Sequence, residues 1–315
     1  MSARYVVLLA LTLAPRVLVG QDGLITAPVA VIESRLRDQS FDVVQQAGSR
    51  FKGDRTSHGL LRFADSSYMD VKLAKAPPGG EEFNNQPRYE IAAYAIQKLF
   101  LNEPDYVVPP TVARMVSVDH YNQISATPSD PTFSDAASVL LILQYWTIDV
   151  TSKGVFDKKR AERDTAYARH LGDLNIFTYL IRQRDANAGN ILISSDTLHP
   201  RMFSVDNGVT FDSPASNRGT EWSNMRVKRI GKATAARLEA LRSEDLQALG
   251  VIAQFERKGG QYVAVEPTAN LDPYRGVRRK GDVLQLGLTG PEINGVRQRL
   301  EWLVGRLRDG RLTTF

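Results

Sequence analysis

Two polar loops, each attached to an apolar run, constrain this chain more than any other feature. The first occupies residues 183–193 and places Asp185 and Asn190 five positions apart, directly before an apolar run. The second occupies residues 203–208, where apolar residues end at Asp206 and an Asn-Gly pair follows. Short apolar runs bounded by such turn residues are typical of strands. The pattern predicts two short strands that bring an acid, a carboxamide and a second acid to one place.

These residue types match the requirements of phosphoryl transfer from a metal-bound nucleotide. That chemistry needs an Asp beside the attacking hydroxyl, an Asn on one metal ion, and a second Asp on the metal that bridges the phosphates. Asp185, Asn190 and Asp206 fit these roles in that order. The spacing of Asp185 and Asn190 is weak evidence alone, and the order of all the parts carries the hypothesis. The alternative is a plain β-hairpin in which 206–208 is only a turn.

Composition excludes several classes of site. The chain has 315 residues, 43% of them hydrophobic, and no cysteine, so disulfides and thiolate metal sites are excluded. The net charge of +5 is too small to indicate a nucleic-acid partner. The histidines are scattered without ligand spacing, so we expect surface positions and no zinc site for His58, His120, His170 and His199.

Residues 1–20 resemble a secretory signal peptide. A basic residue, Arg4, precedes an apolar run that ends at Pro15, and this run is too short to span a bilayer. We therefore expect export and processing near Gly20, which gives a secreted or periplasmic chain without a transmembrane segment in its mature form. The alternative is an N-terminal strand or an overextended start, which would leave a cytoplasmic protein.

Residues 41–76 have a β pattern. A strand near 41–46, a glycine-bearing loop at 48–59 and a hairpin at 60–75 are expected, with Lys72 near the end of the third strand. Kinases place the lysine that holds the α- and β-phosphates at this point, and Lys75 is a rival for the role.

Residues 88–100 follow helical spacing, with Glu90 in the first turn. Glu90 has two interpretations. It is either an acid in the helix turn where negative charge is electrostatically favoured, or it reaches back to Lys72 and forms the lysine–glutamate ion pair of a kinase.

Later segments complete the expected order. Residues 106–118 predict a strand interrupted by proline, followed by a polar loop at 120–134. The continuous apolar run of 138–146 predicts a buried strand leading to a hinge. The last residues of this run are Gln144, Tyr145 and Trp146. Either their backbone is available to bind adenine, or their side chains are part of the hydrophobic core.

The remaining third predicts a polar activation or substrate segment and two helical regions. The segment spans 211–229, and its Arg226, Lys228 and Arg229 either meet an acidic substrate or pair within the lobe. A helix at 235–249 is interrupted at Ser243, and a last helix is capped by Thr289.

Four blocks in order resemble the secretory-pathway kinases, the family of the Golgi casein kinase and the glycosaminoglycan xylosylkinase. The blocks lie within 48–241, at 88–94, 108–116, 174–180 and 205–208. The 185–190 and 206–208 motifs are also shared by phosphatidylinositol 3/4-kinase-like and HipA-type kinases. The resemblance implies an α+β, two-lobed protein-kinase-like fold. We expect a β-rich N-lobe over 21–146 and a mainly helical C-lobe over 147–315.

The resemblance also implies roles for single residues. Lys72 would be the nucleotide lysine, Glu90 the acid that holds it, Asp185 the catalytic aspartate and Asp206 a metal ligand. Asn190 stands where the secretory kinases carry an acid, and it matches the metal ligand of the general kinase pattern.

The implied cofactors are ATP with Mg²⁺ or Mn²⁺, and the implied acceptor is a hydroxyl of a protein, carbohydrate or lipid. A cytosolic phosphatidylinositol-kinase-like or HipA-type kinase and a regulatory nucleotide-binding pseudokinase remain as alternatives. The oligomeric state is left open.

Overall fold

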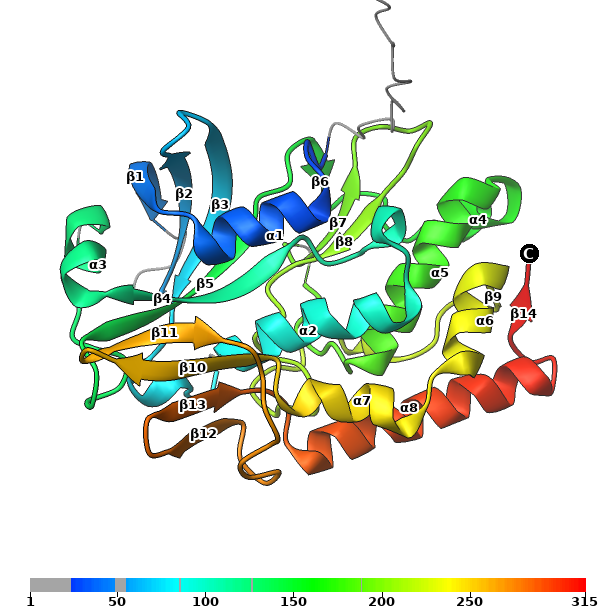
Figure 1. Ribbon diagram of the computed structural model, residues 1–315. Helices are drawn as coiled ribbons and strands as arrows, with labels where there is room; N and C mark the ends of the chain where they lie inside the picture. Colours follow the sequence, from blue (N-terminus) through cyan, green and yellow to red (C-terminus); the bar gives the residue numbers. More distant parts are fainter. Residues whose placement is uncertain (1–23, 49–54, 85, 126, 188) are drawn as a thin grey trace, which may run out of the picture.

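The chain folds into a β-rich lobe and a helical lobe that lie side by side (Figure 1). The computed structural model describes residues 24–48, 55–84, 86–125, 127–187 and 189–315. The expected signal peptide at 1–20 and residues 49–54 of the expected glycine-bearing loop lie outside this range.

The helices have the following bounds: α1 Val29–Asp38, α2 Pro87–Phe100, α3 Val118–Ile124, α4 Lys158–Arg163, α5 Thr165–Leu180, α6 Lys232–Ala240, α7 Ser243–Gln247 and α8 Gly290–Arg308. Short 3-10 turns are η1 Pro78–Gly80, η2 Glu103–Asp105, η3 Thr220–Ser223 and η4 Ala248–Gly250. The strands of the first half are β1 Phe41–Gly48, β2 Thr56–Phe63, β3 Tyr68–Lys75, β4 Thr111–Ser117, β5 Ser138–Tyr145 and β6 Val150–Thr151. The remaining strands are β7 Ile191–Ser194, β8 Met202–Ser204, β9 Arg229–Ile230, β10 Ala253–Lys258, β11 Gln261–Val265, β12 Val277–Lys280, β13 Val283–Leu286 and β14 Thr313–Thr314.

The N-terminal sheet has the antiparallel order β1-β2-β3-β5-β4. Its central strand β5 is buried along its whole length, as the continuous apolar run predicts. Because successive side chains of a strand point to opposite faces, β5 contributes to two cores. Val139, Leu141 and Leu143 face α1 and α3, whereas Leu140 and Ile142 face the opposite side.

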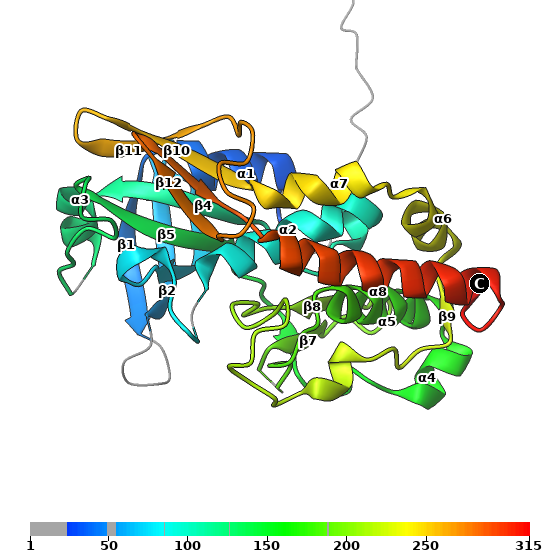
Figure 2. The same cartoon turned by 90° about the horizontal axis from the view of Figure 1, so that it is seen from below.

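That opposite side is covered by a second sheet from the C-terminal third, the order being β11-β10-β13-β12. Phe255, Tyr262, Leu284 and Leu286 pack there with Ile142 of β5. Figure 2 shows β10 and β11 beside β4 and β5, although they are more than 100 residues apart in the chain. This C-terminal sheet was not predicted. It places a β-rich layer inside the segment expected to be mainly helical, whereas the expected division of the chain at 146 stays a prediction.

The helical lobe has its own core, in which α2, α5, α6 and α8 pack with β7 and β8. The predicted last helix is confirmed as α8. Thr289 accepts from the Glu292 N–H, while the Glu292 carboxylate accepts from the Thr289 N–H, which forms a capping box. The Glu292 carboxylate also accepts hydrogen bonds from Arg88, from Nη1 to Oε2 at 2.7 Å and from Nη2 to Oε1 at 2.9 Å. This buried pair ties α8 to the start of α2, two residues before Glu90.

Several predicted boundaries needed correction. The expected strand at 106–118 begins only at Thr111, because Pro109 and Pro110 have no N–H for a sheet ladder. The expected polar loop at 120–134 starts inside a helix, α3, which Ser117 caps by accepting from the His120 N–H. The expected loop at 48–59 gives way to β2 at Thr56. The helix at 235–249 is confirmed as two pieces, α6 and α7, that break before Ser243.

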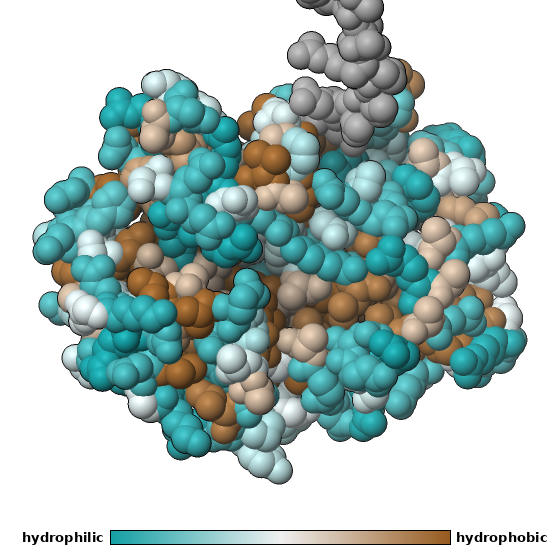
Figure 3. All heavy atoms as spheres, in the orientation of Figure 1, coloured by the Kyte–Doolittle hydropathy of each residue, from teal (hydrophilic) through white to brown (hydrophobic). Residues whose placement is uncertain are grey.

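Hydrophobic side chains gather in a hollow near the middle of the face seen in Figure 3. A groove of about 920 Å³ runs there between α1, α2, β4 and the C-terminal sheet. Ile91, Tyr94, Val112 and Phe255 contribute to its lining. Of the helices in the described part of the chain, none combines the length and hydropathy needed to cross a bilayer.

Candidate active site

Lys72 and Glu90 form the ion pair that the sequence suggested. Val71 and Leu73 turn toward the α1 side of the N-terminal sheet, so Lys72 turns toward α2. There its Nζ donates to Glu90 Oε1 at 2.6 Å, and both side chains are largely buried. The Nζ also donates to Asp206 Oδ1 at 2.9 Å. One lysine therefore joins the sheet, the helix α2 and the loop after β8.

Lys75 is excluded from this cluster. Its Nζ donates to Ser129 Oγ at 3.0 Å and lies over the Tyr121 ring, 5.5 Å from the centroid. Burial and the charge of Arg55 lower the pKa of Lys75. Of the two lysines, Lys72 is therefore the one that joins Glu90 and Asp206.

Lys72 and Asp206 each stabilise the charged form of the other. Burial lowers the pKa of Lys72, but the Asp206 and Glu90 carboxylates outweigh it and leave that pKa well above its ordinary value. The Lys72 ammonium in turn lowers the pKa of Asp206. The lowered pKa keeps the Asp206 carboxylate ionised at neutral pH, and the side chain is accessible because 59% of it is exposed.

Asp206 adopts the left-handed backbone conformation, with φ of 58°. Such a conformation is sparsely populated for non-glycine residues, although Asp tolerates it better than most. The turn is fixed by the residue that follows, because the Asn207 N–H donates to Glu90 Oε2 at 3.0 Å. Glu90 thus holds Lys72 with one oxygen and the Asp206 turn with the other.

A buried amide connects this turn to the Asp185 loop. Gln183 Nε2 donates to Asn207 Oδ1 at 3.0 Å, and Gln183 Oε1 accepts from the Asp185 N–H at 3.0 Å. Asn207 Oδ1 also accepts from Ser204 Oγ at 2.8 Å. The sequence analysis gave Gln183 and Asn207 no role, and their fully buried amides explain how two separate loops keep a fixed relation.

Asp185 and Asn190 lie together, as their spacing predicted. Asn190 Nδ2 donates to the Asp185 carbonyl at 2.7 Å and to its Oδ2 at 3.2 Å. The Asn190 carbonyl also accepts a hydrogen bond from the Val205 N–H at 2.9 Å. This bond joins the end of the Asp185 loop to the residue that precedes Asp206. The two predicted strands are found as β7 and β8, and they pair antiparallel.

Two residues from the polar segment after β8 also contact Asp185, and the sequence analysis missed both. Ser216 Oγ donates to Asp185 Oδ1 at 2.6 Å. Arg218 approaches the same oxygen with Nε and Nη2, each at 3.1 Å. They are separated from Asp185 by more than 30 residues, so local spacing carried no signal for them.

The three residues expected at the hinge behave differently from one another. The buried Gln144 side chain donates to Thr111 Oγ1 at 2.9 Å, and the Tyr145 hydroxyl lies 3.2 Å from Thr26 Oγ1. The N–H groups of Tyr145 and Trp146 donate to the Pro110 and Asp70 carbonyls. These two N–H groups are therefore not available to adenine, contrary to the expectation. The Trp146 side chain is exposed and stacks against His58.

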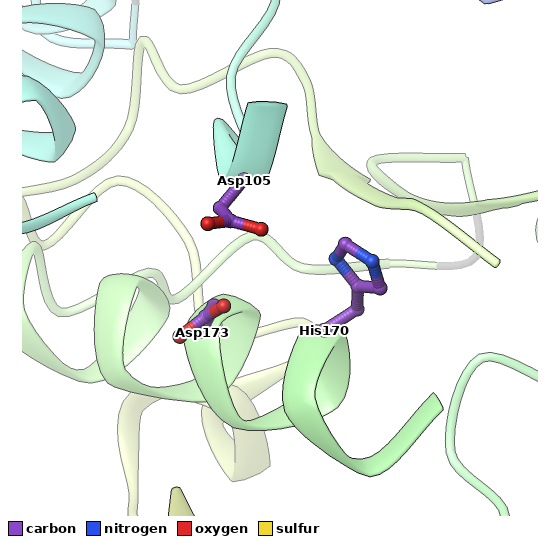
Figure 4. A group of neighbouring side chains, drawn as sticks. All are labelled: Asp105, His170 and Asp173. Atoms are coloured by element: carbon purple, nitrogen blue, oxygen red, sulfur yellow. The ribbon is translucent and has the colours of Figure 1, made fainter. Parts of the chain in front are cut away.

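His170 is buried, so the expectation that every histidine lies at the surface is wrong. It shares one face of α5 with Asp173, and Asp105 of η2 lies opposite them (Figure 4). One ligand atom from each of the three lies within 4.8 Å of the others. Burial lowers the pKa of His170 to about 4 and raises the pKa of Asp173 to about 7. We call Asp105, His170 and Asp173 the α5 cluster.

No protein-family model and no curated protein matches this sequence. Solved structures do match the fold. One is the structure of hydra Fam20 with sugar, with a TM-score of 0.50 and 14% identity over 91% of this chain and 90% of that chain. The MAP kinase LmaMPK10 from Leishmania major gives only 0.31 and 10% identity, over 57% and 49% of the two chains. From the first likeness and the arrangement of its elements, the chain has an α+β, two-lobed kinase-like fold.

Proposed function

We propose that this chain is an exported, ATP-dependent kinase that transfers the γ-phosphoryl group to a hydroxyl of a protein or carbohydrate. The observation that carries the proposal is the convergence of Lys72, Glu90 and Asp206 from three separate elements, with Lys72 Nζ 2.6 Å from Glu90 and 2.9 Å from Asp206. A lysine held by a helix glutamate beside a metal-binding aspartate is the arrangement that kinases use to hold ATP.

The residues present fit a metal-bound nucleotide. The Asp206 carboxylate is exposed and ionised, and Asn190 uses its amide nitrogen on Asp185, which leaves its Oδ1 for a metal. Oxygen ligands of this kind suit Mg²⁺ or Mn²⁺. Bound metal–ATP would supply the transferable phosphoryl group. Lys72 would neutralise phosphate charge, and the exposed Trp146 indole offers an apolar face for the base.

Asp185 is the residue for the acceptor. Its carboxylate accepts a hydrogen bond from the Ser216 hydroxyl, and this contact supports a role in orienting a hydroxyl group. In the reaction, Asp185 would orient the acceptor hydroxyl and take its proton. The Fam20 structure contains sugar, which supports a carbohydrate among the acceptors considered. Export rests on the apolar start of the sequence alone.

Lys72→Met is expected to reduce phosphate transfer by roughly 10²-fold or more, since a fixed positive charge on the phosphates is lost. The matched control is Lys75→Met, which removes a lysine three residues away whose Nζ points to Ser129. The measurement is transfer of labelled phosphate from ATP, with Mg²⁺ or Mn²⁺, to protein and glycan mixtures and to the chain itself.

Equal activity of the two lysine variants would contradict the assignment of Lys72. Wild-type protein that binds metal–ATP in titration calorimetry but transfers no phosphate would instead support the pseudokinase alternative. Recovery of the native protein from the cytosol with Met1 intact would contradict export and favour the cytosolic alternatives.

A further inference from the structure

Ser216 presents its hydroxyl to the Asp185 carboxylate. Its Oγ donates to Asp185 Oδ1 at 2.6 Å, the same kind of hydrogen bond that a substrate hydroxyl makes to a catalytic aspartate. Ser216 is partly exposed, so its hydroxyl is not sealed inside the lobe.

The segment around Ser216 is fitted to the Asp185 loop. Gly219 has a φ of 128°, and a Cβ at this position would lie 2.6 Å from the Ala186 backbone. Only glycine therefore permits the close approach. Arg218 reaches the Asp185 carboxylate and also contributes to lowering the pKa of Asp206, which places its charge near both acids. Ser216 is thus held by its own segment at the centre of the site.

The geometry points to Ser216 as a phosphorylation site that the chain modifies itself; this inference rests on the proposed kinase function. Ser216 Oγ attacks the γ-phosphorus of ATP and forms a P–O bond. The bond from the γ-phosphorus to the bridging oxygen of the β-phosphate breaks, and ADP leaves with the electron pair. Asp185 accepts the hydroxyl proton, so that the products are phosphoserine, ADP and a proton.

Phosphorylation also changes what occupies the site. A phosphoserine carries about −1.5 to −2 charges, so it is repelled by the Asp185 carboxylate that the hydroxyl had contacted. Arg218 contacts the same Asp185 oxygen and its side chain is 70% exposed, so it is a cation able to follow the phosphate away from Asp185. Transfer to Ser216 therefore frees Asp185 for the hydroxyl of a separate acceptor.

The test is peptide mapping by mass spectrometry after incubation with ATP and Mg²⁺ or Mn²⁺. Wild type is expected to gain phosphate at Ser216, at a rate independent of protein concentration because donor and acceptor share one chain. Ser216→Ala is expected to lose that phosphate. The matched control Ser223→Ala removes a hydroxyl of the same segment that donates to the Thr220 carbonyl instead, and it should still be phosphorylated at Ser216.

The outcomes separate this inference from the proposed function. Phosphate on another residue or on an added acceptor, with none on Ser216, overturns the Ser216 assignment while the kinase function stands. Binding of metal–ATP without any phosphate on the chain also overturns it. A chain that neither binds metal–ATP in calorimetry nor transfers phosphate contradicts the proposed function itself.

A second inference comes from the α5 cluster and is independent of the first. His170 is only 8% exposed, and among the described residues no hydrogen bond to its ring is found. Asp105 Oδ1 is buried and also lacks a hydrogen bond within the described structure, although Arg169 Nη2 lies 3.0 Å away. Asp173 Oδ1 accepts from Thr234 Oγ1 at 2.7 Å. Asp105 and Asp173 thus each have a partner, whereas the buried His170 ring shows no hydrogen bond in the described structure. An unsatisfied buried polar group is costly, so a ligand bound by the His170 ring would stabilise this cluster.

We infer that the α5 cluster is a divalent-cation site of the zinc type, separate from the site proposed at Asp206. One imidazole nitrogen and carboxylate oxygens are common zinc ligands. His170 and Asp173 are three residues apart on α5, which puts them on one face. Zinc ligands lie about 3.3 Å apart, and the three ligand atoms lie within 4.8 Å of one another, so small side-chain shifts suffice to bring them onto one ion. The charges of Arg169 and Arg201 also face the cluster, and Arg169 is half exposed and able to turn outward.

Titration calorimetry with ZnCl₂ alone, followed by thermal unfolding, tests this site. Wild type is expected to bind one Zn²⁺ and to unfold at a higher temperature with it, because a ligand of the folded state stabilises that state. His170→Ala and Asp173→Asn should lose the binding. His199→Ala, at an exposed histidine paired with Asp196, and Asp206→Asn should keep it.

Absence of zinc binding by the wild type at tens of micromolar metal overturns the site, whatever the variants do. Binding that survives in both α5 variants, or that disappears in His199→Ala, also overturns it and points to surface coordination. Circular dichroism of each variant ensures that a loss of binding is read from folded protein.

Discussion

Asp206→Asn is expected to weaken binding of metal–ATP by roughly 10-fold or more, which is about 1.4 kcal/mol for each factor of ten. Phosphate transfer should fall by roughly 10²-fold or more, because a metal that neutralises developing charge is no longer held. Asparagine has the shape of aspartate and tolerates the left-handed backbone at this position, where φ is 58°. The variant therefore removes the negative charge without forcing the turn to change. Calorimetric titration with ATP and Mn²⁺ or Mg²⁺ measures the loss.

The fold should survive this substitution, since Lys72 keeps its buried pair with Glu90. Asp212→Asn is the matched control, because Asp212 is also an aspartate with positive φ, at 72°, whose partners Arg182 and Arg299 lie outside the site. Because the pKa of Asp206 is lowered, its carboxylate stays ionised as pH falls toward the ordinary aspartate value, so wild-type metal binding should persist there. Unchanged nucleotide affinity in Asp206→Asn would contradict the metal assignment.

The sequence was most informative where local chemistry decides the structure. The Lys72 strand and the Glu90 helix could be placed because alternating and helical patterns are local, and their pairing then followed from the packing of α2 against the sheet. The buried strand β5 was evident from its continuous apolar run. Thr289 could be recognised as the cap of the last helix, and the structure adds Glu292, three residues later, as the second half of a capping box.

The elements that were missed depend on distant packing, or gave a local signal that was not used. The C-terminal sheet consists of short strands that bury only one to three residues each, and only contact with β5 completes their core. Gly259 and Gly260 both have positive φ and mark the β10–β11 hairpin, which was a usable turn signal. Helix α1 buries Val29, Ile32 and Leu36 at helical spacing and was equally open to prediction.

The candidate site was predictable in its charged residues and not in the groups that hold them. Asp185 and Asp206 stood out because acids in turns after apolar runs suggest chemistry. Gln183 and Asn207 carry no comparable signal, since a buried amide is recognised only once its partners are known. Ser216 belongs to a polar segment in which any of several hydroxyls could have faced the site.

Asp185→Asn is expected to separate catalysis from nucleotide binding. Within the described structure its side chain contacts Ser216, Arg218, Asn187 and Asn190, and no contact with Lys72 or Asp206 is found. Affinity for metal–ATP should therefore change little. Turnover should fall by roughly 10²–10⁴-fold, because asparagine can orient a hydroxyl but cannot take its proton.

Measuring Asp185→Asn beside Asp206→Asn distinguishes a residue that serves the acceptor from one that holds the metal. Calorimetry reports nucleotide binding, and labelled-phosphate transfer reports turnover, for both variants under the same metal and ATP concentrations. Asp185→Asn should lose turnover alone, whereas Asp206→Asn should lose both. If both variants lose nucleotide binding equally, Asp185 belongs to the metal site and another group must serve the acceptor. If neither variant changes binding or turnover, the cluster around Lys72 does not perform phosphoryl transfer, and the kinase-like fold of this chain serves a different chemistry.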